Sequence, residues 1–349
     1  MRSAAQRGVP LEEQLEAHLS GRTLDWDSIR IYLEVARHGS FRSAAERLGL
    51  SINVLRRRIE ELEHHLSATL LTRHVDGVRM TIEGQHILAA AEKMEAASYG
   101  ILRARDRALP EVAGEVKLAV TEGIGTFWLA PRLVAFQRAH PQLLVDLNCA
   151  MRSADVLRLE ADAAVQLTKP TAPDLKIVKL GRLHSMPFAS PSYIDTYGVP
   201  KTREDFLNHR VVMQFADQTS TKELFEQTFP GVPQAGFVAM RTNVSTAHVW
   251  AVAKGAGIGW VPTYVHAIGG LMVPIDVDIR FHFDIWLTYH SDAGRIPRVR
   301  RMIDWIIASF DSREFPWFRD EFIHPKDLPK EYRGEPLVNL FAGFAWPTP

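Results

Sequence analysis

The stretch LEVARHGSFRSAAERLGLSINVLRRRIEEL, residues 33–62, decides the fold of the N-terminal part of the chain. Its pattern predicts helices separated by short breaks. Gly39 and Gly49 stand where helices stop, and Ser40 and Ser51 stand where a hydroxyl can cap the next helix. Apolar residues in the last segment are spaced by four, three and four positions, which predicts one buried helical face: Leu55, Ile59, Leu62 and Leu66.

Downstream of this stretch the pattern changes to a hairpin. An extended segment begins at Leu70–Leu71, and Asp76–Gly77 has the composition of a two-residue hairpin turn before Val78 and Met80. The order is helix, helix, short turn, helix, hairpin. Residues 24–83 are therefore predicted to form a mainly α winged helix-turn-helix DNA-binding domain.

A long linker helix is predicted over residues 84–112, and Thr81 can cap the start of this helical stretch. Alanines lie along its apolar side, and its length exceeds that of an ordinary core helix. A rod that joins two domains, or a helix that pairs with its copy in a dimer, fits this pattern better. Pro110 and Gly114 mark its end.

From Val116 onward strands alternate with helices, which predicts an α/β body over residues 113–312 with a mainly parallel sheet and room for two lobes. The predicted strands are Val116–Val120, Leu143–Leu147, Ala163–Leu167, Ile177–Leu180, Pro187–Ala189, Arg210–Gln214 and Val238–Arg241. The predicted helices are Ala130–Ala139, Ser192–Thr196, Lys222–Gln227 and Thr246–Gly255. Residues 1–23 form an N-terminal extension. Residues 313–349 form an aromatic and proline-rich C-terminal extension that either packs as a strap, on its own or a neighbouring body, or is partly disordered.

Composition restricts the class of protein. The 349 residues carry 41 Lys plus Arg against 41 Asp plus Glu, which excludes binding of polyanions by bulk charge. The lone cysteine, Cys149, is expected to be a buried small hydrophobe and favours a reducing compartment. No uninterrupted apolar run predicts an export signal or a membrane helix. A cytoplasmic protein is expected.

Several motifs in this order resemble the LysR-type transcriptional regulators across residues 24–312. They are Leu33–Phe41, Ala44–Leu48, Ser51, Ile59–Glu63, Arg79–Thr81 with Gly84, Leu129–Pro131, Ala161–Val165, Ala189–Tyr193 and Ala251–Ile258. The resemblance implies a two-lobed, periplasmic-binding-protein-like effector domain and a linker helix that dimerises. It also implies a homotetramer on double-stranded promoter DNA, a small-molecule effector between the lobes, and RNA polymerase as a partner.

The DNA-reading residues are expected on the N-terminal half of the second helix of the motif, which enters the major groove in such proteins. Arg57 aligns with the family's usual recognition-helix arginine, whereas Ile52, Asn53 and Arg56 depart from the family's usual residues. A salt-bridged surface, Arg56–Glu60 and Arg57–Glu61, is the alternative reading. The full set of candidate DNA contacts, including phosphate and wing positions, is Ser40, Arg42, Ser51, Ile52, Asn53, Arg56, Arg57, Arg73 and Arg79.

Effector contacts are expected where strands end and helices begin in the α/β body. The loop Thr121–Thr126 follows the first strand, and its Glu122 would repel an anion if it pointed inward. The candidate effector-binding residues are Thr121, Gly123, Thr126, Phe215, Asn243 and Ser245. An ordinary strand–helix loop and, for Asn243 and Ser245, simple helix capping are the alternatives.

Two other classes of protein remain as alternatives: an enzyme on an α/β body, and a solute-binding protein with a head that does not read DNA. The sequence holds no nucleophile elbow, P-loop, dinucleotide-binding fingerprint or metal-ligand spacing. We therefore expect a transcriptional regulator without enzymatic activity, cofactor or metal.

Overall fold

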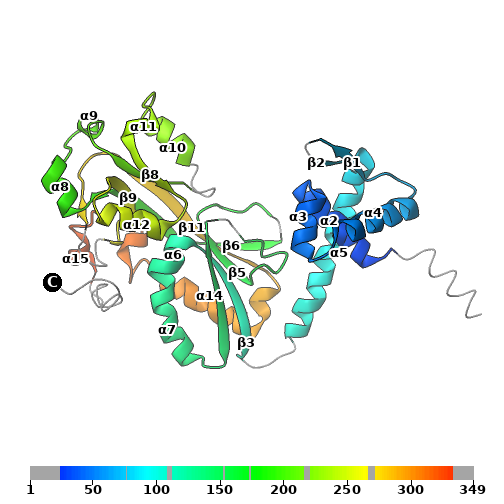
Figure 1. Cartoon of the computed structure of the whole chain (residues 1–349). Helices are drawn as coiled ribbons and strands as arrows, with labels where there is room; N and C mark the ends of the chain where they lie inside the picture. Colours follow the sequence, from blue (N-terminus) through cyan, green and yellow to red (C-terminus); the bar gives the residue numbers. More distant parts are fainter. Residues whose placement is uncertain are drawn as a thin grey trace, which may run out of the picture. The chain divides into compact units, whose positions relative to one another are not determined.

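The computed structural model describes residues 24–75, 77–107, 112–151, 154–172, 174–215, 221–265 and 272–332. The chain divides into two compact units, Met1–Tyr99 and Gly100–Pro349, and the division falls within helix α5 (Ile82–Arg107) (Figure 1). The predicted extension 1–23 and residues 333–349 lie outside the described residues. No helix in the described part of the chain is long and apolar enough to cross a membrane.

The first unit has the predicted order of elements. Its helices are α2 (Trp26–His38), α3 (Phe41–Leu48) and α4 (Ile52–Leu66), followed by strands β1 (Leu71–His74) and β2 (Gly77–Met80). Ser40 and Ser51 cap α3 and α4 by accepting backbone N–H groups, as predicted. Gly39 and Gly49 end α2 and α3 with φ of 58° and 64°, the left-handed region that glycine adopts without steric cost.

Hydrogen bonds tie the hairpin and the first turn of α5 to helix α2 and the residue that ends it. The N–H of Val78 donates to the carbonyl of Gly39 at 2.7 Å, and the Tyr32 hydroxyl donates to the carbonyl of Gly84 at 2.6 Å. β1 and β2 pair antiparallel, with His74 opposite Gly77. Asp76, half of the predicted turn, lies outside the described residues. The core of this unit contains the predicted apolar face Leu55, Ile59 and Leu62.

Helix α5 follows the hairpin directly. The Thr81 hydroxyl accepts the N–H of Gly84 at 2.9 Å, so the predicted cap is present. Large apolar side chains remain exposed along the helix, among them Ile82 and Ile101, which are 68% and 72% exposed. Residues 108–111 lie outside the described part, so the end of the predicted linker at 112 stays a prediction.

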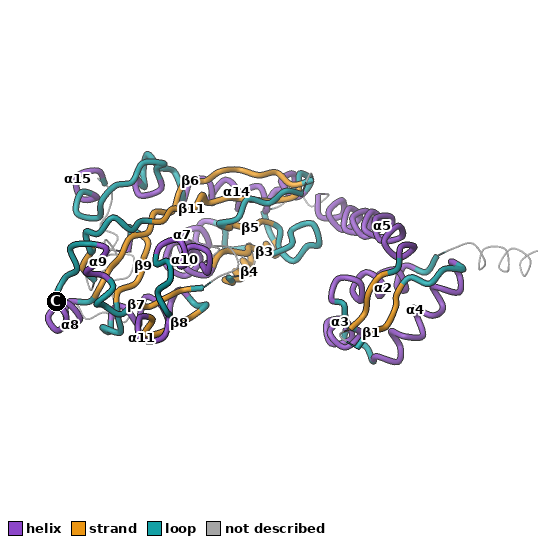
Figure 2. The backbone as a smooth tube through the Cα atoms, turned by 90° about the horizontal axis from the view of Figure 1, so that it is seen from above, coloured by secondary structure: helices purple, strands orange, loops and turns teal. Residues whose placement is uncertain are grey.

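The second unit is built on one nine-stranded sheet in the order β4-β3-β5-β11-β6-β9-β7-β8, with β10 paired to β6 (Figures 1 and 2). The strands are β3 (Gly114–Thr121), β4 (Leu143–Ala150), β5 (Ala163–Gln166), β6 (Leu175–Ala189), β7 (Val211–Gln214), β8 (Val238–Thr242), β9 (Ile258–Pro262), β10 (Val273–Pro274) and β11 (Phe281–His290).

The prediction of a mainly parallel sheet is wrong. β3 lies parallel to β4 and β5, and β7 lies parallel to β8 and β9. The long central strands β6 and β11 run antiparallel to each other and to their other neighbours. The segments predicted as two short strands, Ile177–Leu180 and Pro187–Ala189, are parts of the single strand β6, because Gly181 and Pro187 interrupt its apolar pattern. β9 and β11 were not predicted at all.

Helices pack around this sheet, and the predicted ones are present with small shifts of their ends. The helical elements that the structure describes in this unit are α6 (Glu122–Ile124), the π-helical turn η1 (Gly125–Leu129), α7 (Ala130–Ala139), α8 (Pro191–Tyr197), α9 (Arg203–Phe206), α10 (Thr221–Thr228), α11 (Gln234–Phe237), α12 (Ser245–Ala253), η3 (Ala293–Arg295), α14 (Pro297–Ser309), η4 (Pro316–Phe318) and α15 (Leu328–Glu331). The predicted ones correspond to α7, α8, α10 and α12. Separate hydrophobic cores, one around Trp128 and one around Phe206, mark two lobes.

The described part of the C-terminal extension packs on its own unit. The rings of Phe315, Trp317 and Phe318 surround Trp128, with centroid distances of 4.9, 5.4 and 4.9 Å. The Arg132 guanidinium lies 3.3 Å from the centroid of the Trp128 ring, and burial lowers the pKa of Arg132 to about 10. Aromatic residues of the segment 313–332 therefore belong to the core of the second unit, and the segment packs as the strap that was one of the predicted alternatives.

Candidate DNA-reading surface and ligand cavity

The N-terminal half of α4 presents its polar side chains to solvent. The Ser51 hydroxyl accepts the N–H of Val54 at 3.3 Å, which fixes the start of the helix. Asn53, Arg56 and Arg57 are exposed. This matches the placement expected of a recognition helix, whose first turns approach base edges while its caps and ends approach phosphates.

The arginines of α4 make weak, exposed contacts. Arg57 pairs with Glu61 at 3.6 Å, as the salt-bridge alternative requires. Arg56 lies instead over the Phe41 ring, 5.8 Å from its centroid, so the predicted Arg56–Glu60 pair is not formed. Exposed pairs of this kind contribute about 0–1 kcal/mol. Both guanidinium groups can therefore exchange these partners for phosphate or guanine at little cost.

The other candidate DNA contacts lie on α3 and the hairpin. Arg42 pairs with Glu46 at 3.3 Å, and both side chains are exposed. Arg73 on β1 lies 3.8 Å from Glu60, and Arg79 on β2 is exposed. The Ser40 hydroxyl already accepts a backbone N–H as the cap of α3, and Ile52 is half-buried in the core of the unit.

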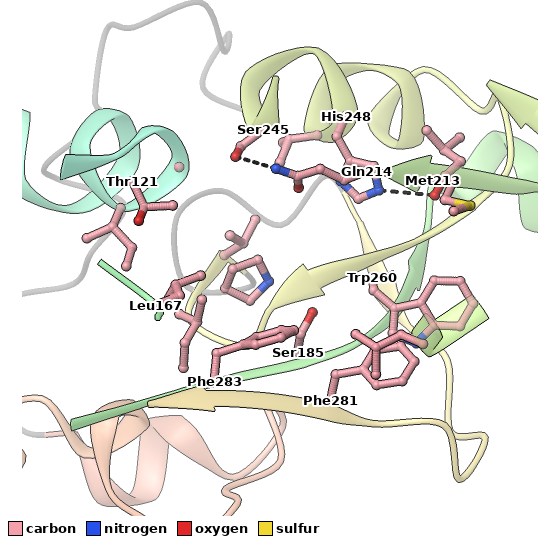
Figure 3. Close-up of a pocket in the computed structure, with 18 of the residues that line it drawn as sticks. Thr121, Leu167, Ser185, Met213, Gln214, Ser245, His248, Trp260, Phe281 and Phe283 are labelled. Atoms are coloured by element: carbon pink, nitrogen blue, oxygen red, sulfur yellow. Dashed lines mark hydrogen bonds between the residues drawn. The ribbon is translucent and has the colours of Figure 1, made fainter. Parts of the chain in front are cut away.

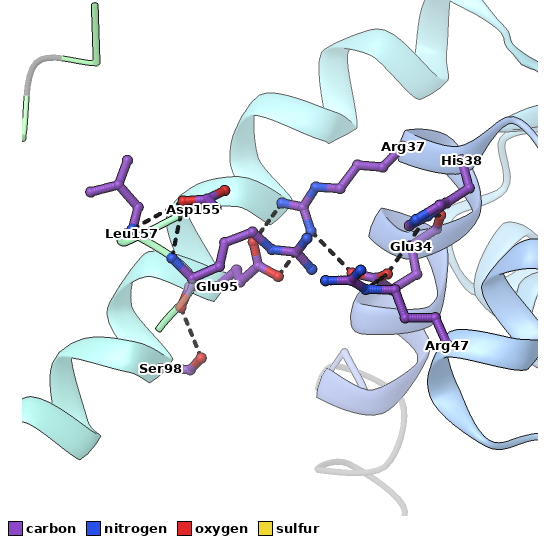
Figure 4. Close-up of polar contacts among 9 residues, drawn as sticks. Glu34, Arg37, His38, Arg47, Glu95, Ser98, Asp155 and Leu157 are labelled. Carbon is purple, nitrogen blue, oxygen red and sulfur yellow. Dashed lines mark hydrogen bonds and ion pairs between the residues drawn. The ribbon is translucent and has the colours of Figure 1, made fainter. Parts of the chain in front are cut away.

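A buried ion cluster in the first unit was not found from the sequence (Figure 4). Glu34 is 3% exposed and lies 3.3 Å from Arg47, 3.4 Å from Arg37 and 3.7 Å from His38. Arg37 also makes a bidentate pair with the buried Glu95 of α5, at 3.0 and 2.5 Å. Charges this buried are costly to leave unpaired. The cluster therefore fixes α2, α3 and the middle of α5 relative to one another within the first unit.

The second unit contains a cavity of about 160 Å³ that both lobes line (Figure 3). The wall is mostly apolar and aromatic. It includes Phe127, Leu167, Leu183, Met213, Phe225, Phe229, Trp260, Tyr264, Phe281 and Phe283. Polar lining comes from Thr121, Ser185, Gln214, Thr228, Ser245 and His248.

The structure brings three of the predicted effector residues to this cavity, namely Thr121, Gly123 and Ser245. The other three are not among the residues that line it. The Thr126 hydroxyl donates to the Glu122 carboxylate at 3.4 Å. Phe215, directly after β7, is 46% exposed, and Asn243 is exposed.

Helix α12 begins without a side-chain cap of its own, so the capping alternative for Asn243 and Ser245 is wrong. Two donors of its first turn bond instead to Glu122 from the other lobe. One carboxylate oxygen accepts the N–H of Ser245 at 2.6 Å, and the other accepts the Thr246 hydroxyl at 2.5 Å. Gly123 is required beside this contact, because a Cβ there would lie 2.8 Å from the Ser245 hydroxyl oxygen.

Two polar groups at the cavity wall are held by the protein itself. The Gln214 amide donates to the Ser245 hydroxyl at 2.7 Å. His248 is fully buried, and its Nε2 lies 3.1 Å from the carbonyl of Val212 (Figure 3). Burial lowers the pKa of His248 to about 4, so the imidazole is neutral at pH 7 and we assign its Nε2 as the N–H donor. These long-range contacts had no signal in the sequence.

Cys149 lies on β4 next to this loop and is half-buried, less than the sequence led us to expect. Burial raises the pKa of its thiol, and the charge of Glu122 adds to the rise. The thiol is therefore protonated at pH 7 and is a poor nucleophile.

A winged helix-turn-helix and a two-lobed α/β unit with an internal cavity define a class of protein: a transcriptional regulator with a separate sensing domain. Two protein-family models match the chain. They are described as "Bacterial regulatory helix-turn-helix protein, lysR family", over residues 26–85, and "LysR substrate binding domain", over residues 110–311. The chain belongs to the LysR family of transcriptional regulators, as its sequence motifs indicated.

Curated relatives have matching descriptions. An HTH-type transcriptional regulator of Xanthomonas campestris pv. campestris (strain 8004) is 32% identical over 196 residues, which is 54% of this chain and 55% of the relative. The HTH-type transcriptional regulator DmlR of Escherichia coli (strain K12) is 25% identical, covering 84% of this chain and 96% of the relative. These relatives are regulators, so the enzyme alternative finds no support among them.

Solved structures show the same fold. The full-length Vibrio cholerae virulence activator AphB has a TM-score of 0.52 at 18% identity and covers 82% of this chain and 99% of that chain. CrgA, a LysR-type transcriptional regulator from Neisseria meningitidis, has a TM-score of 0.51 at 19% identity, covering 83% of this chain and 100% of that chain.

Proposed function

We propose that this regulator binds promoter DNA in the cytoplasm through the N-terminal half of α4, and that a small molecule in the cavity controls the response. The observation that carries the DNA-reading part is the exposed Arg56–Arg57 pair on the first turns of a Ser51-capped helix in a winged helix-turn-helix. Arginine can donate two hydrogen bonds to the O6 and N7 atoms of guanine, and this selects the base.

The other candidate contacts support positioning on the duplex. Arg42, Arg73 and Arg79 can neutralise phosphates, and Ser40 and Ser51 stand at helix N-termini, where backbone N–H groups favour phosphate. Asn53 can read adenine, and Ile52 can contact a thymine methyl group.

Assembly of at least a dimer is part of this proposal, with a homotetramer as the expected form on DNA. The exposed apolar side chains of α5, such as Ile82 and Ile101, support a helix that pairs with its copy. A ligand that binds one arrangement of the two lobes better than another would shift the population of arrangements, and with it promoter activity through RNA polymerase.

The test is footprinting on DNA upstream of the gene for this protein, at two salt concentrations, with the wild type and Arg57→Ala. We expect protection over two spaced half-sites for the wild type. Loss of one base-reading arginine should weaken specific binding by about 1–3 kcal/mol, or roughly 5- to 150-fold. Arg138→Ala is the matched control, because Arg138 is an exposed arginine on α7 in the other unit. It should leave the footprint unchanged.

Two other footprints would contradict the proposed function. Salt-sensitive coverage without boundaries, equal in wild type and Arg57→Ala, would mean that α4 does not read bases. A single protected half-site would argue against the dimer.

A further inference from the structure

Charge is distributed unevenly between the cavity and the first turn of α12. The described residues that line the cavity include no Lys, Arg, Asp or Glu, while Glu122 stands beside it between two lining residues, Thr121 and Gly123. We infer that the cavity selects an uncharged ligand of about one aromatic ring, and that Glu122 is the residue that excludes anions. This inference rests on the proposed function, in which the cavity is the effector site.

Glu122 takes the position that an anionic ligand would need. The N-terminus of a helix attracts negative charge through its free N–H groups and its dipole. In α12 the Glu122 carboxylate already occupies this end, since it accepts the N–H of Ser245 and the hydroxyl of Thr246. A second carboxylate at this point would meet a like charge and would find the Ser245 N–H and the Thr246 hydroxyl occupied.

The rest of the wall offers no compensation for a charge. An ion moved from water into an apolar cavity without a partner loses far more solvation energy than a neutral polar group. His248 cannot supply a cation at pH 7, because it is buried, neutral and bonded to Val212. An uncharged ligand avoids this cost.

Ser185 provides a place for one polar group of such a ligand. It is 7% exposed, lines the cavity, and its hydroxyl has no hydrogen-bond partner among the described residues. In Figure 3 this hydroxyl points into the space between Phe283 and Trp260. Because the residue lines the cavity, its hydroxyl is open to a ligand group that forms a hydrogen bond with it.

The size of the cavity and the chemistry of its wall favour a ligand with one aromatic ring. A cavity of about 160 Å³ is close to the volume at which an apolar protein cavity binds benzene, about 150 Å³. The aromatic wall formed by residues such as Phe281 and Phe283 suits offset or edge contacts with such a ring. The expected ligand is therefore one ring with an uncharged hydrogen-bonding substituent.

The experiment compares benzamide with benzoate, which share the ring and differ in charge at pH 7. Binding to the full chain is measured by ligand-observed NMR titration. The wild type should bind benzamide at least tenfold more tightly than benzoate. Glu122→Gln keeps the size of the side chain and removes its charge, so it should reduce this ratio. Glu226→Gln, at an exposed acid of α10 that does not line the cavity, should leave it unchanged.

Ser185→Ala tests whether the ligand binds in this cavity. It should weaken benzamide binding about three- to tenfold, the usual effect of one lost hydrogen bond. Melting curves check that each variant is folded.

Benzoate binding as tight as benzamide in the wild type, or no binding of benzamide at millimolar concentration, would overturn the inference. An unchanged ratio in folded Glu122→Gln would overturn the part assigned to Glu122. These titrations contain no DNA, so a failure of the footprinting experiment leaves them valid. If benzamide binds with the predicted selectivity but its addition leaves the DNA footprint unchanged, the cavity chemistry is supported and the effector role is contradicted.

Discussion

The proposed recognition face of α4 and the cavity of the second unit have opposite surface chemistry. The face on α4 exposes charged side chains that contact only weak partners, such as Glu61 for Arg57. The cavity has an uncharged wall, and its polar groups are mostly bonded within the protein, as Gln214 is to Ser245. A polyanionic duplex is bound by exchanging water and weak ion pairs, whereas a small uncharged ligand is bound by burial.

The two regions also differ in how they are built. The helix ends of the first unit are fixed by residues within three positions, such as Ser51 with Val54. The cavity depends on contacts between residues far apart in the chain, such as Glu122 with Ser245. Substitutions at the helix caps of the first unit should therefore have local, modest effects, and substitutions in the core of the second unit should have larger ones.

The largest expected effect is that of Phe318→Ala. Phe318 is 1% exposed, and its ring contacts Trp128, Tyr264 and Phe310. Removing it leaves a void in the larger core, which should lower the free energy of unfolding of the second unit by about 3–5 kcal/mol. Urea denaturation followed by tryptophan fluorescence measures this change.

Phe322→Ala is the matched control, because Phe322 lies in the same segment and is only half-buried. Its effect should be clearly smaller. A change below about 1 kcal/mol for Phe318→Ala would show that the strap is not part of the core.

The next effect depends on pH. The pKa of His248 is lowered to about 4 in the folded chain, against about 6.5 when unfolded, so between these values the unfolded state binds more protons. The contribution of neutral His248 to the free energy of unfolding is fully present above about pH 6.5. It is lost as the pH falls toward 4, by a total of about 3 kcal/mol. Denaturation midpoints of the wild type should fall more steeply over this window than those of His248→Gln.

His282→Gln serves as the comparison, because His282 is exposed on β11. It should follow the wild-type pH dependence. Parallel curves for the wild type and His248→Gln would mean that His248 is not buried in its neutral form.

The sequence predicted the first unit well because its signals are local. Glycines at Gly39 and Gly49 and hydroxyls at Ser40 and Ser51 each act within one helical turn, and all four have the predicted roles in the fold. The buried cluster was missed because Glu95 lies 58 residues from Arg37, and no pattern near either residue shows the pairing.

The second unit was predicted as a succession of elements but not as a sheet. The alternating pattern gave α7 with correct ends, yet β11 returns across the sheet between β5 and β6, and no local signal specifies such an order. In the cavity, too, the sequence indicated local features and missed long-range contacts. The loop Thr121–Thr126 was found from its place after a strand, whereas the clamp from Glu122 to Ser245 and Thr246 depends on how the lobes close.

The smallest effect separates the two roles of Ser51, which caps α4 and is also a proposed phosphate contact. Ser51→Ala removes the cap and should lower the stability of the first unit by about 1 kcal/mol, within a range of about 0.5–2. Ser51→Asp keeps a good capping group and favours the helix dipole, so the stability should stay near that of the wild type. The added negative charge would, however, repel the DNA backbone and weaken binding. Ser43→Ala, at an exposed serine of α3 that accepts no capping bond, is the stability control. Equal DNA binding by Ser51→Asp and the wild type would restrict Ser51 to its structural role and confine the DNA contact of α4 to the residues that follow it.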